Sequence, residues 1–259
     1  MPLKLSANLG FLFQDKPLLE RFEAAAKCGF KAVECTNDIY EVDKDVLVQA
    51  KEKANVKVIL INMPKKVTAL PGKESEFKES LDLAIDYATA LDCPRIHLSP
   101  GSLSTPMDWS NPEWQAARST YLSNVSYAAD LCSPKGIILT LEPLSTIPNV
   151  FLQYQQQAAD YIRELKKDNV KLQFDFYHAQ RNGGNLCEFL EKNIDIVGHV
   201  QISQVPGRHE PDLEGEINCP FVFKTLERLR FDGWMGAEYT PRSTIEEGLD
   251  WAKEYINNS

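Results

Sequence analysis

The chain has 259 residues, of which 43% are hydrophobic and 25% are charged, and its formal net charge is −9. This composition excludes a disordered chain or a coiled coil, because enough apolar side chains are present to form a full core. The negative charge argues against broad nucleic-acid binding, which requires Lys and Arg to neutralise phosphates. At this length a (β/α)8 barrel is one common single-domain solution.

The six cysteines are spread along the chain without a C-x-x-C pair, so neither a zinc ribbon nor a thioredoxin-type site is predicted. We expect them to be reduced and mostly buried. The first residues lack the apolar segment of a signal peptide, and no window holds the roughly 18 consecutive apolar residues of a membrane span. The sequence therefore predicts a cytoplasmic protein that binds no membrane and no nucleic acid, and it leaves a homo-oligomer open.

Short apolar runs alternate with helical patterns along the whole chain. After the first run Asp15 is expected to cap a helix, with Pro17 in its first turn and Gly29 at its end. The last helix is predicted to open with a capping box formed by Ser243 and Glu246. The predicted strands cover residues 4–13, 31–35, 56–63, 95–99, 136–143, 170–177, 196 to about 201, and 234–239. The predicted helices follow them near residues 17–29, 42–54, 77–91, 114–131, 154–167, 186–193, 221–229 and 243–256.

Eight apolar strands, each followed by an amphipathic helix and with no linker between halves, predict a single (β/α)8 TIM barrel over residues 1–259. A doubly wound sheet is the weaker alternative. No Gly-x-Gly-x-x-Gly follows the first strand and no Walker-type Gly-Lys-Ser/Thr occurs, so nucleotide-binding folds lack their usual motifs.

Polar residues stand where four consecutive apolar runs end, which is where a barrel of this kind places its active site. Glu142 ends the fifth strand, Asp175 lies in the sixth with His178 just beyond it, Gln201 lies near the end of the seventh, and Glu238 ends the eighth. Three carboxylates and an amide oxygen are hard ligands that suit Mg²⁺ or Mn²⁺. The pattern therefore favours a divalent metal site formed by Glu142, Asp175, Gln201 and Glu238.

Each of these residues also has an ordinary explanation. A carboxylate at a strand end is often a helix cap or a solvated charge. Glu34, at the end of the second strand, could support the site or merely cap a helix, and His97 and His199, inside apolar strands, are expected to be structural histidines. The joint placement on consecutive strands makes the metal site the preferred interpretation.

The segment after the seventh strand is polar and contains Arg208 among several carboxylates. A solvated loop is the usual explanation for such a segment. The alternative is that Arg208 binds the carboxylate of a small substrate beside the metal, because a guanidinium group holds a carboxylate in a bidentate fork.

Several motifs resemble hydroxypyruvate isomerase, within the xylose-isomerase-like barrel superfamily. The matching runs are residues 139–143, 174–181, 198–202, 206–211, 215–218 and 236–239. The gapped motif after the seventh strand is specific, whereas the isolated Glu and Asp motifs are shared across the superfamily. The resemblance covers nearly the whole chain. It implies a catalytic pair of Glu142 and Glu238, a metal set that adds Asp175 and Gln201, and substrate contacts from His178 and Arg208. Gln201 stands where sugar epimerases of the superfamily tend to have His.

The reaction that the resemblance implies is an aldose–ketose type isomerisation of a keto acid, hydroxypyruvate to tartronate semialdehyde, through a metal-stabilised enediolate. One Glu would remove a proton and the other would return it. The nearest rival is an isomerase or 3-epimerase of a longer keto acid or ketose. A DNA-repair endonuclease of the superfamily would need several His ligands and a basic face, and the chain has four His and a net charge of −9. Glu142 and Glu238 argue against a barrel that binds a metabolite without turnover.

Overall fold

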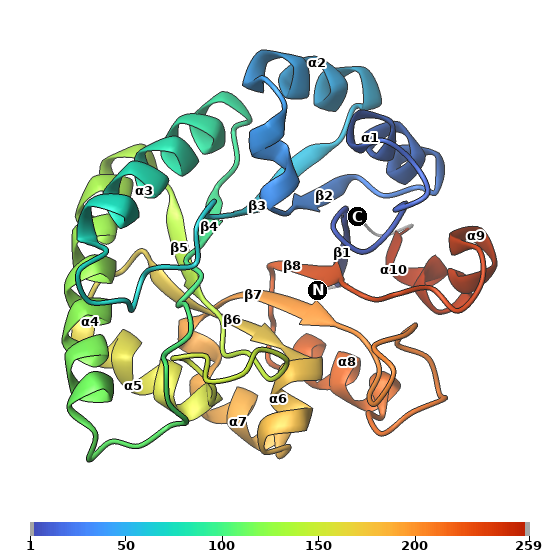
Figure 1. Cartoon of the computed structure of the whole chain (residues 1–259). Coiled ribbons are helices and arrows are strands. Elements are labelled where there is room, and N and C mark those ends of the chain that lie inside the picture. The colour runs from blue at the N-terminus through green and yellow to red at the C-terminus, as the bar shows by residue number, and fades with distance from the viewer. Residues whose placement is uncertain (1–2, 257–259) are drawn as a thin grey trace.

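The computed structural model describes residues 3–256 and contains a closed barrel of eight parallel strands, ordered β1 to β8 around the ring (Figure 1). The strands are β1 Lys4–Asn8, β2 Ala32–Cys35, β3 Lys57–Asn62, β4 Arg95–His97, β5 Ile138–Leu141, β6 Val170–Asp175, β7 Val197–Ile202 and β8 Trp234–Ala237. The ring closes where β8 pairs with β1, with Ala237 beside Ala7. The predicted (β/α)8 fold is confirmed. The ends of the predicted domain, residues 1–2 and 257–259, lie outside the described residues.

Helices surround the strands on the outside of the barrel (Figure 1). The α-helices are α1 Leu18–Lys27, α2 Lys44–Ala54, α3 Glu74–Ala90, α4 Pro112–Cys132, α5 Gln155–Leu165, α6 Phe176–Asn182, α7 Leu186–Asn193, α8 Cys219–Arg228, α9 Ile245–Gly248 and α10 Lys253–Ile256. Short 3-10 turns are η1 Asn37–Glu41, η2 Ser133–Lys135, η3 Ile194–Ile196 and η4 Asp250–Ala252. Across residues 3–256 no helix has the length and apolar character needed to cross a membrane.

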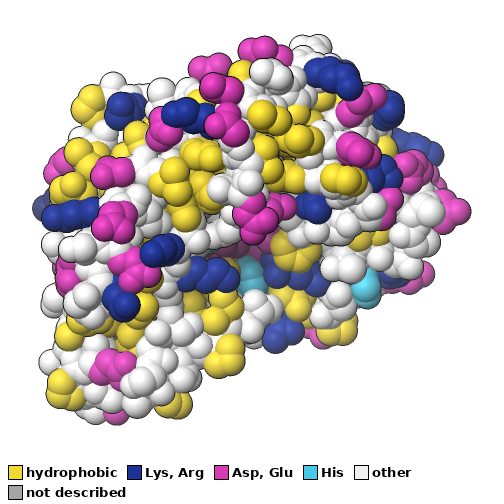
Figure 2. Space-filling view, turned by 45° about the horizontal axis from the view of Figure 1, so that its top comes forward, with side chains coloured by type: hydrophobic (Ala, Val, Ile, Leu, Met, Phe, Trp, Pro, Cys, Tyr) yellow, Lys and Arg dark blue, Asp and Glu magenta, His cyan; other side chains and the backbone are white. Residues whose placement is uncertain are grey.

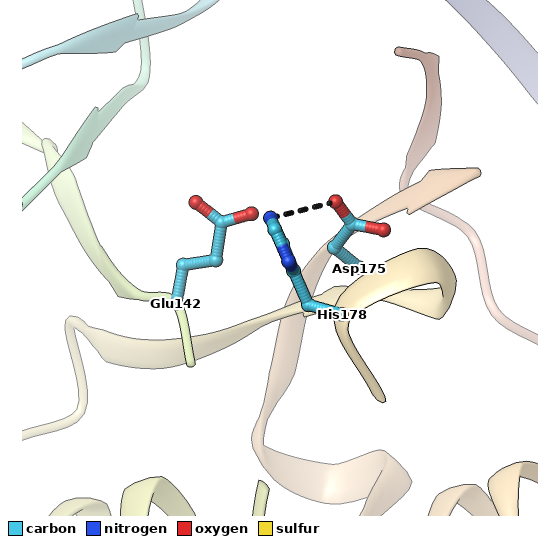
Figure 3. A group of neighbouring side chains, drawn as sticks. All are labelled: Glu142, Asp175 and His178. Carbon is cyan, nitrogen blue, oxygen red and sulfur yellow. Dashed lines mark ion pairs between the residues drawn. The ribbon is translucent and has the colours of Figure 1, made fainter. Parts of the chain in front are cut away.

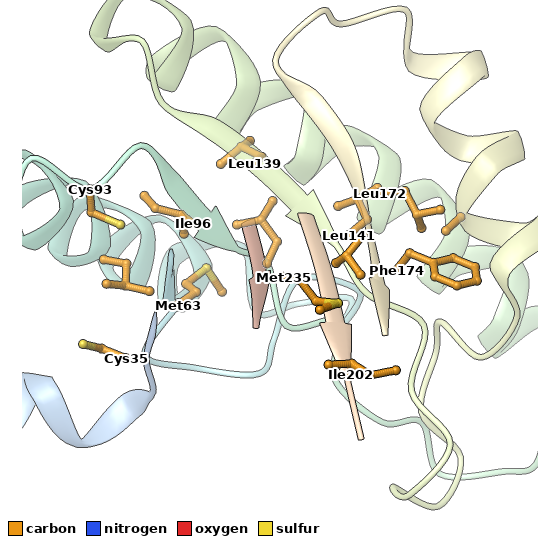
Figure 4. Packing of buried hydrophobic residues seen from close by; sticks show 14 of the residues in the cluster. Cys35, Met63, Cys93, Ile96, Leu139, Leu141, Leu172, Phe174, Ile202 and Met235 are labelled. Carbon is orange, nitrogen blue, oxygen red and sulfur yellow. The ribbon is translucent and has the colours of Figure 1, made fainter. Parts of the chain in front are cut away.

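The main apolar core packs the strands against the helices (Figure 4). Phe174 of β6, for example, stacks on Phe189 of α7 with ring centroids 5.6 Å apart. Because side chains alternate along a strand, the neighbouring positions Gln173 and Asp175 point to the other face, into the barrel. Both are fully buried. The interior of the barrel is therefore polar near the C-terminal end of β6, the end at which a barrel of this kind carries its active site.

Several details differ from the sequence-based expectations. The first strand was predicted to continue to residue 13, but β1 ends at Asn8 and the chain turns after it. Asp15 caps no helix: it pairs with Lys16, and α1 begins at Leu18 after Pro17, whose fixed φ already suits a helix start. The last cap is Thr244, which accepts from the N–H of Glu247, so the predicted capping box was wrong by one residue. The last predicted helix is divided into α9, η4 and α10.

A further difference concerns β6, which was predicted to continue to residue 177 and instead ends at Asp175. The Asp175 carboxylate accepts a bond from the N–H of Tyr177 at 2.7 Å and so starts α6. A side-chain cap of this kind satisfies a free amide of the first helical turn. The short helix α6, which the sequence pattern did not predict, places His178 three residues after Asp175 on the same side of the helix.

Candidate active site

Three carboxylates meet at the C-terminal ends of the strands. Glu142 follows β5, Asp175 ends β6 and Glu238 follows β8, and the side chains are 6%, 1% and 12% exposed. Ligand atoms of Glu142, Asp175 and His178 all lie within 4.8 Å of one another. Figure 3 shows the His178 ring between the two carboxylates. The structure thus brings Glu142 to Asp175 and His178, which follow it by more than thirty positions in the sequence.

Arg208 lies among these acids. Its Nη2 is 2.9 Å from Oε1 of Glu238 and 3.1 Å from Oδ2 of Asp175. The guanidinium is held between two rings, 4.5 Å from the Phe11 centroid and 4.8 Å from that of Tyr177. Its Nε is buried without a hydrogen-bond partner. Arg208 can therefore also contact a small molecule bound at the carboxylates, although its Nη2 is already paired with Glu238 and Asp175.

The acids are difficult to ionise together. Burial, and then repulsion by Glu238 and Asp175, raises the pKa of Glu142 well above its usual value. Burial likewise raises the pKa of Glu238 to about 8, against the opposing effect of Arg208. Carboxyl groups with strongly raised pKa values in a shared cluster are candidates for proton transfer near neutral pH.

The cluster fits a divalent cation. Oε1 of Glu142 and Oε2 of Glu238 are buried and have no hydrogen-bond partner. Three carboxylates face one guanidinium, so full ionisation would leave a formal charge of two minus, which a divalent ion would balance. Carboxylate oxygens are also the ligands that Mg²⁺ and Mn²⁺ prefer. The observations support Glu142 and Asp175 as the centre of a metal site, whereas Glu238 is connected to Asp175 through Arg208 and does not belong to the group of ligand atoms within 4.8 Å.

His178 is a poor ligand for that ion. Its Nδ1 accepts a hydrogen bond from the backbone N–H of Ser145 at 3.1 Å, so Nδ1 carries no proton. Burial lowers the pKa of His178 to about 4, which makes the ring neutral near pH 7. The one remaining proton is then on Nε2, the nitrogen 3.6 Å from Asp175. A ligating histidine needs a free lone pair on that nitrogen and normally donates from the other one. Its Nε2, which also lies 3.5 Å from Nη2 of Arg208, can instead donate to a molecule bound at the cluster.

Gln201 occupies a layer below the carboxylates. Its Nε2 donates to Glu34 at 2.9 Å, and its Oε1 accepts from Gln173 at 2.7 Å. No described hydrogen bond joins Gln201 to Arg208 or to the three carboxylates. Glu34 is buried inside the barrel, so the alternative that it is a helix cap was wrong. It supports the layer that contains Gln201.

His97 was expected to be a purely structural histidine, and the structure places it beside the site. Its Nε2 lies 3.5 Å from Oε2 of Glu142, and its Nδ1 lies 3.2 Å from Asn62. Burial lowers the pKa of His97 to about 3, so the ring is neutral. The sequence did contain a signal, because His97 ends a strand next to the strand that Glu142 follows.

The loop after β7 is folded rather than solvated. Gln204 is 1% exposed and its amide donates to the carbonyls of Asp212 and Ile217, while its oxygen accepts from the N–H groups of Val205 and Ile217. A Cβ at Gly215 would lie 2.1 Å from Gln204, so this position requires glycine. The loop holds Arg208 in a left-handed conformation with φ 55°.

The mouth of the barrel opens on a surface that carries several kinds of charge. In a view tilted from that of Figure 1, a hollow near the middle of the face brings a histidine together with Lys or Arg side chains (Figure 2). A separate cavity of about 600 Å³ lies between the β1–α1 loop and residues 240–246, and Phe11 borders it. Phe11 also contacts Arg208, so one ring separates this cavity from the carboxylates.

Comparison with known proteins gives a consistent result. The family described as xylose isomerase-like TIM barrel matches residues 22–255. A Danio rerio protein named "Putative hydroxypyruvate isomerase" is 38% identical, with 98% of this chain and 96% of that protein covered. A Haemophilus influenzae protein named 2-oxo-tetronate isomerase is 39% identical, with coverage of 97% and 99%. A crystal structure from Brucella melitensis, described as AP endonuclease, family 2, has 38% identity, coverage of 98% and 99%, and a TM-score of 0.91.

Proposed function

The chain belongs to the xylose isomerase-like TIM barrel family, and we propose that it is an isomerase of short keto acids that interconverts hydroxypyruvate and 2-hydroxy-3-oxopropanoate, or tartronate semialdehyde. The observation that carries this proposal is the pair of buried acids Glu142 and Glu238, both with raised pKa values, beside Arg208. An isomerisation of this type moves one proton between adjacent carbons, and two such acids are what it needs.

Glu142 and Glu238 perform the proton transfer in this proposal. They stand on different strands of the ring, so a small substrate between them can lose a proton to one and receive a proton from the other. A positioned general acid or base contributes about 10²–10⁴-fold to the rate. Their burial keeps water from the enediol that forms between the two steps.

His178 and Arg208 orient the substrate. His178 donates from Nε2 to a substrate oxygen, in a ring orientation that Ser145 fixes. Arg208 pairs with the substrate carboxylate through the part of the guanidinium that Glu238 and Asp175 do not occupy. Because Arg208 is already held between two aromatic rings, it loses little conformational entropy when the substrate binds.

A divalent ion, Mg²⁺ or Mn²⁺, would be held by Glu142, Asp175 and Glu238, with Gln201 as the fourth ligand that we propose, through the second lone pair of the oxygen that accepts from Gln173. When bound, it would act as a Lewis acid that lowers the pKa of the substrate C–H and offsets developing negative charge.

Two relatives suggest other substrates. The 2-oxo-tetronate isomerase supports the alternative of a longer keto acid, which would keep the same carboxylate contact. The name of the Brucella structure suggests a DNA substrate. A chain with a net charge of −9 is poorly suited to neutralise the phosphates of a DNA backbone. A keto acid remains the substrate class that Arg208 supports best.

The test is a direct assay of the purified protein with hydroxypyruvate, with 2-oxo-tetronate and with a neutral ketose. Each would be measured with Mg²⁺ or Mn²⁺ and after treatment with a chelator. We expect metal-dependent turnover of at least one keto acid that exceeds turnover of the ketose. Preference for the ketose, or no turnover of either acid, would contradict the proposal.

A further inference from the structure

Glu34 is a buried carboxylate that the proposed reaction does not use. It lies on β2, is 1% exposed and accepts four hydrogen bonds. Its Oε1 accepts from Ser6 Oγ at 2.7 Å and from His199 Nε2 at 3.0 Å, and its Oε2 accepts from Gln201 Nε2 at 2.9 Å and from Asn8 Nδ2 at 3.2 Å. The donors come from β1 and β7, on two sides of the ring.

The barrel is built to admit this group. A Cβ at Gly236 on β8 would lie 2.0 Å from Oε1 of Glu34, so no other residue leaves room for the carboxylate. The oxygen of the Asn8 amide accepts from the N–H of Gly10, which leaves the nitrogen for Glu34. Burial acts to raise the pKa of Glu34, but His199 and the other donors bring it below the usual value. Each oxygen of Glu34 faces two donors, so the carboxylate acts only as an acceptor.

A chain of side chains leads from Glu34 to the site. Gln201 donates to Glu34 and accepts from Gln173 Nε2 at 2.7 Å. Gln173 in turn accepts from the hydroxyl of Thr140 at 2.7 Å, which leaves its NH₂ group for Gln201 and for Glu142, whose raised pKa this amide opposes. An amide has one accepting end and one donating end, so fixing one amide of such a chain fixes the next.

We propose that Glu34 is a positioning residue that sets the direction of this chain, so that Gln173 turns its NH₂ group, and not its carbonyl oxygen, toward Glu142. Because Glu34 only accepts, Gln201 must turn its NH₂ group toward Glu34 and its carbonyl oxygen toward Gln173. The reversed chain would put two amide oxygens against the carboxylates of Glu34 and Glu142. Such contacts are costly where water is excluded.

The test is Glu34→Gln, which keeps the shape of the side chain but offers one acceptor oxygen and two new N–H groups to the same four donors. The one acceptor oxygen can serve either Ser6 and His199 or Gln201 and Asn8, so one of these two pairs must change its partner or its orientation. The chain has four histidines, so long-range ¹H–¹⁵N spectra can follow them individually. We expect the signals of His199 or the side-chain NH₂ signals of Gln201 and Gln173 to shift, and kcat to fall by roughly 10–100-fold, as for other groups that orient an active-site side chain. KM should change by less than about threefold, because no substrate contact is removed.

Ser6→Ala is the matched control. It removes one donor to the same oxygen and leaves the acceptor-only carboxylate in place, so kcat should stay within about threefold of the wild type. Equal kcat values in Glu34→Gln and Ser6→Ala would overturn the proposal.

A second variant, Gln173→Met, removes the link between Gln201 and Glu142 and tests the chain even if Glu34→Gln does not fold. Unchanged kcat in Gln173→Met would overturn the proposal. In the double variant the loss should be no greater than in the more affected single variant, because both act through one chain, whereas independent effects would multiply.

The effect on turnover rests on the proposed isomerase function, but the His199 spectrum does not. If the wild type turned over no keto acid, the proposed function would fail. Unchanged His199 signals together with unchanged side-chain NH₂ signals of Gln201 and Gln173 in Glu34→Gln would overturn the role of Glu34 separately.

Discussion

At the scale of single residues, Arg208 decides between a keto acid and a neutral sugar. Lys at this position would keep the charge but lose the planar fork and the packing between Phe11 and Tyr177. We expect Arg208→Lys to lower kcat/KM for the keto acid by about ten- to a hundredfold, since charge-assisted hydrogen bonds contribute on the order of 1.5–3 kcal/mol. The loss on a neutral ketose should be smaller.

Steady-state kinetics on both substrates would measure this difference, with the exposed Arg228→Lys as control. An equal loss on the two substrates, or none on either, would show that Arg208 does not bind the carboxylate.

In the metal-free protein, we expect the free energy of unfolding to depend on pH through Glu238. Its pKa is about 8 in the folded state and 4.5 in the reference state, so the folded state binds the proton more tightly. The stability associated with this group is therefore present below about pH 4.5 and is lost as the pH rises through about 8. With a chelator present, Tm of the wild type should fall more steeply between pH 5 and 8 than Tm of Glu238→Gln. Parallel curves would argue against the raised pKa, and the exposed Glu52→Gln is the control.

Most residues of the site could be predicted from the sequence, but several of their contacts could not. Glu142, Asp175 and Glu238 were found because each ends an apolar run, which is a local signal. The contact of His97 with Glu142 and the tautomer of His178 depend on Asn62 and on the backbone of Ser145. Those partners come from other strands and loops, and no spacing in the sequence identifies them. The roles assigned to the site residues stay predictions.

At the scale of elements, the loop after β7 is organised by one side chain. Gln204→Leu would leave the N–H and C=O groups of Ile217 and two further backbone groups without partners, each at a cost of about 1–3 kcal/mol. We expect faster hydrogen exchange over residues 203–218 and a raised KM for the keto acid, because Arg208 would lose its fixed position. Gln156→Leu, exposed on α5, should change neither. Unchanged exchange in the loop would contradict this account.

The elements that were mispredicted share a physical cause. Asp175 and Thr244 accept backbone N–H groups, and these side-chain caps decide where α6 and α9 begin. The apolar pattern around Phe176 is equally compatible with a longer strand, so periodicity alone could not separate the two. The mistake matters here because α6 is what brings His178 to Asp175.

At the scale of the whole molecule, the alternation of eight strands and helices was enough to predict the barrel. Closure of β8 on β1 completes the ring, and it sets Glu238 at the same end of the barrel as Glu142 and Asp175. The cytoplasmic location, the single domain over residues 1–259 and a homo-oligomer stay predictions, because they do not follow from the fold of one chain.

The central claim is that Glu142 and Glu238 transfer the proton in a keto-acid isomerisation. The most direct measurement is the turnover of hydroxypyruvate by the metal-loaded wild type beside Glu142→Gln and Glu238→Gln, with circular dichroism on the same samples. We predict turnover by the wild type, a loss of at least about 10²-fold in each variant, as expected for a general acid or base, and unchanged spectra. Turnover near the wild-type rate in either folded variant would contradict the claim.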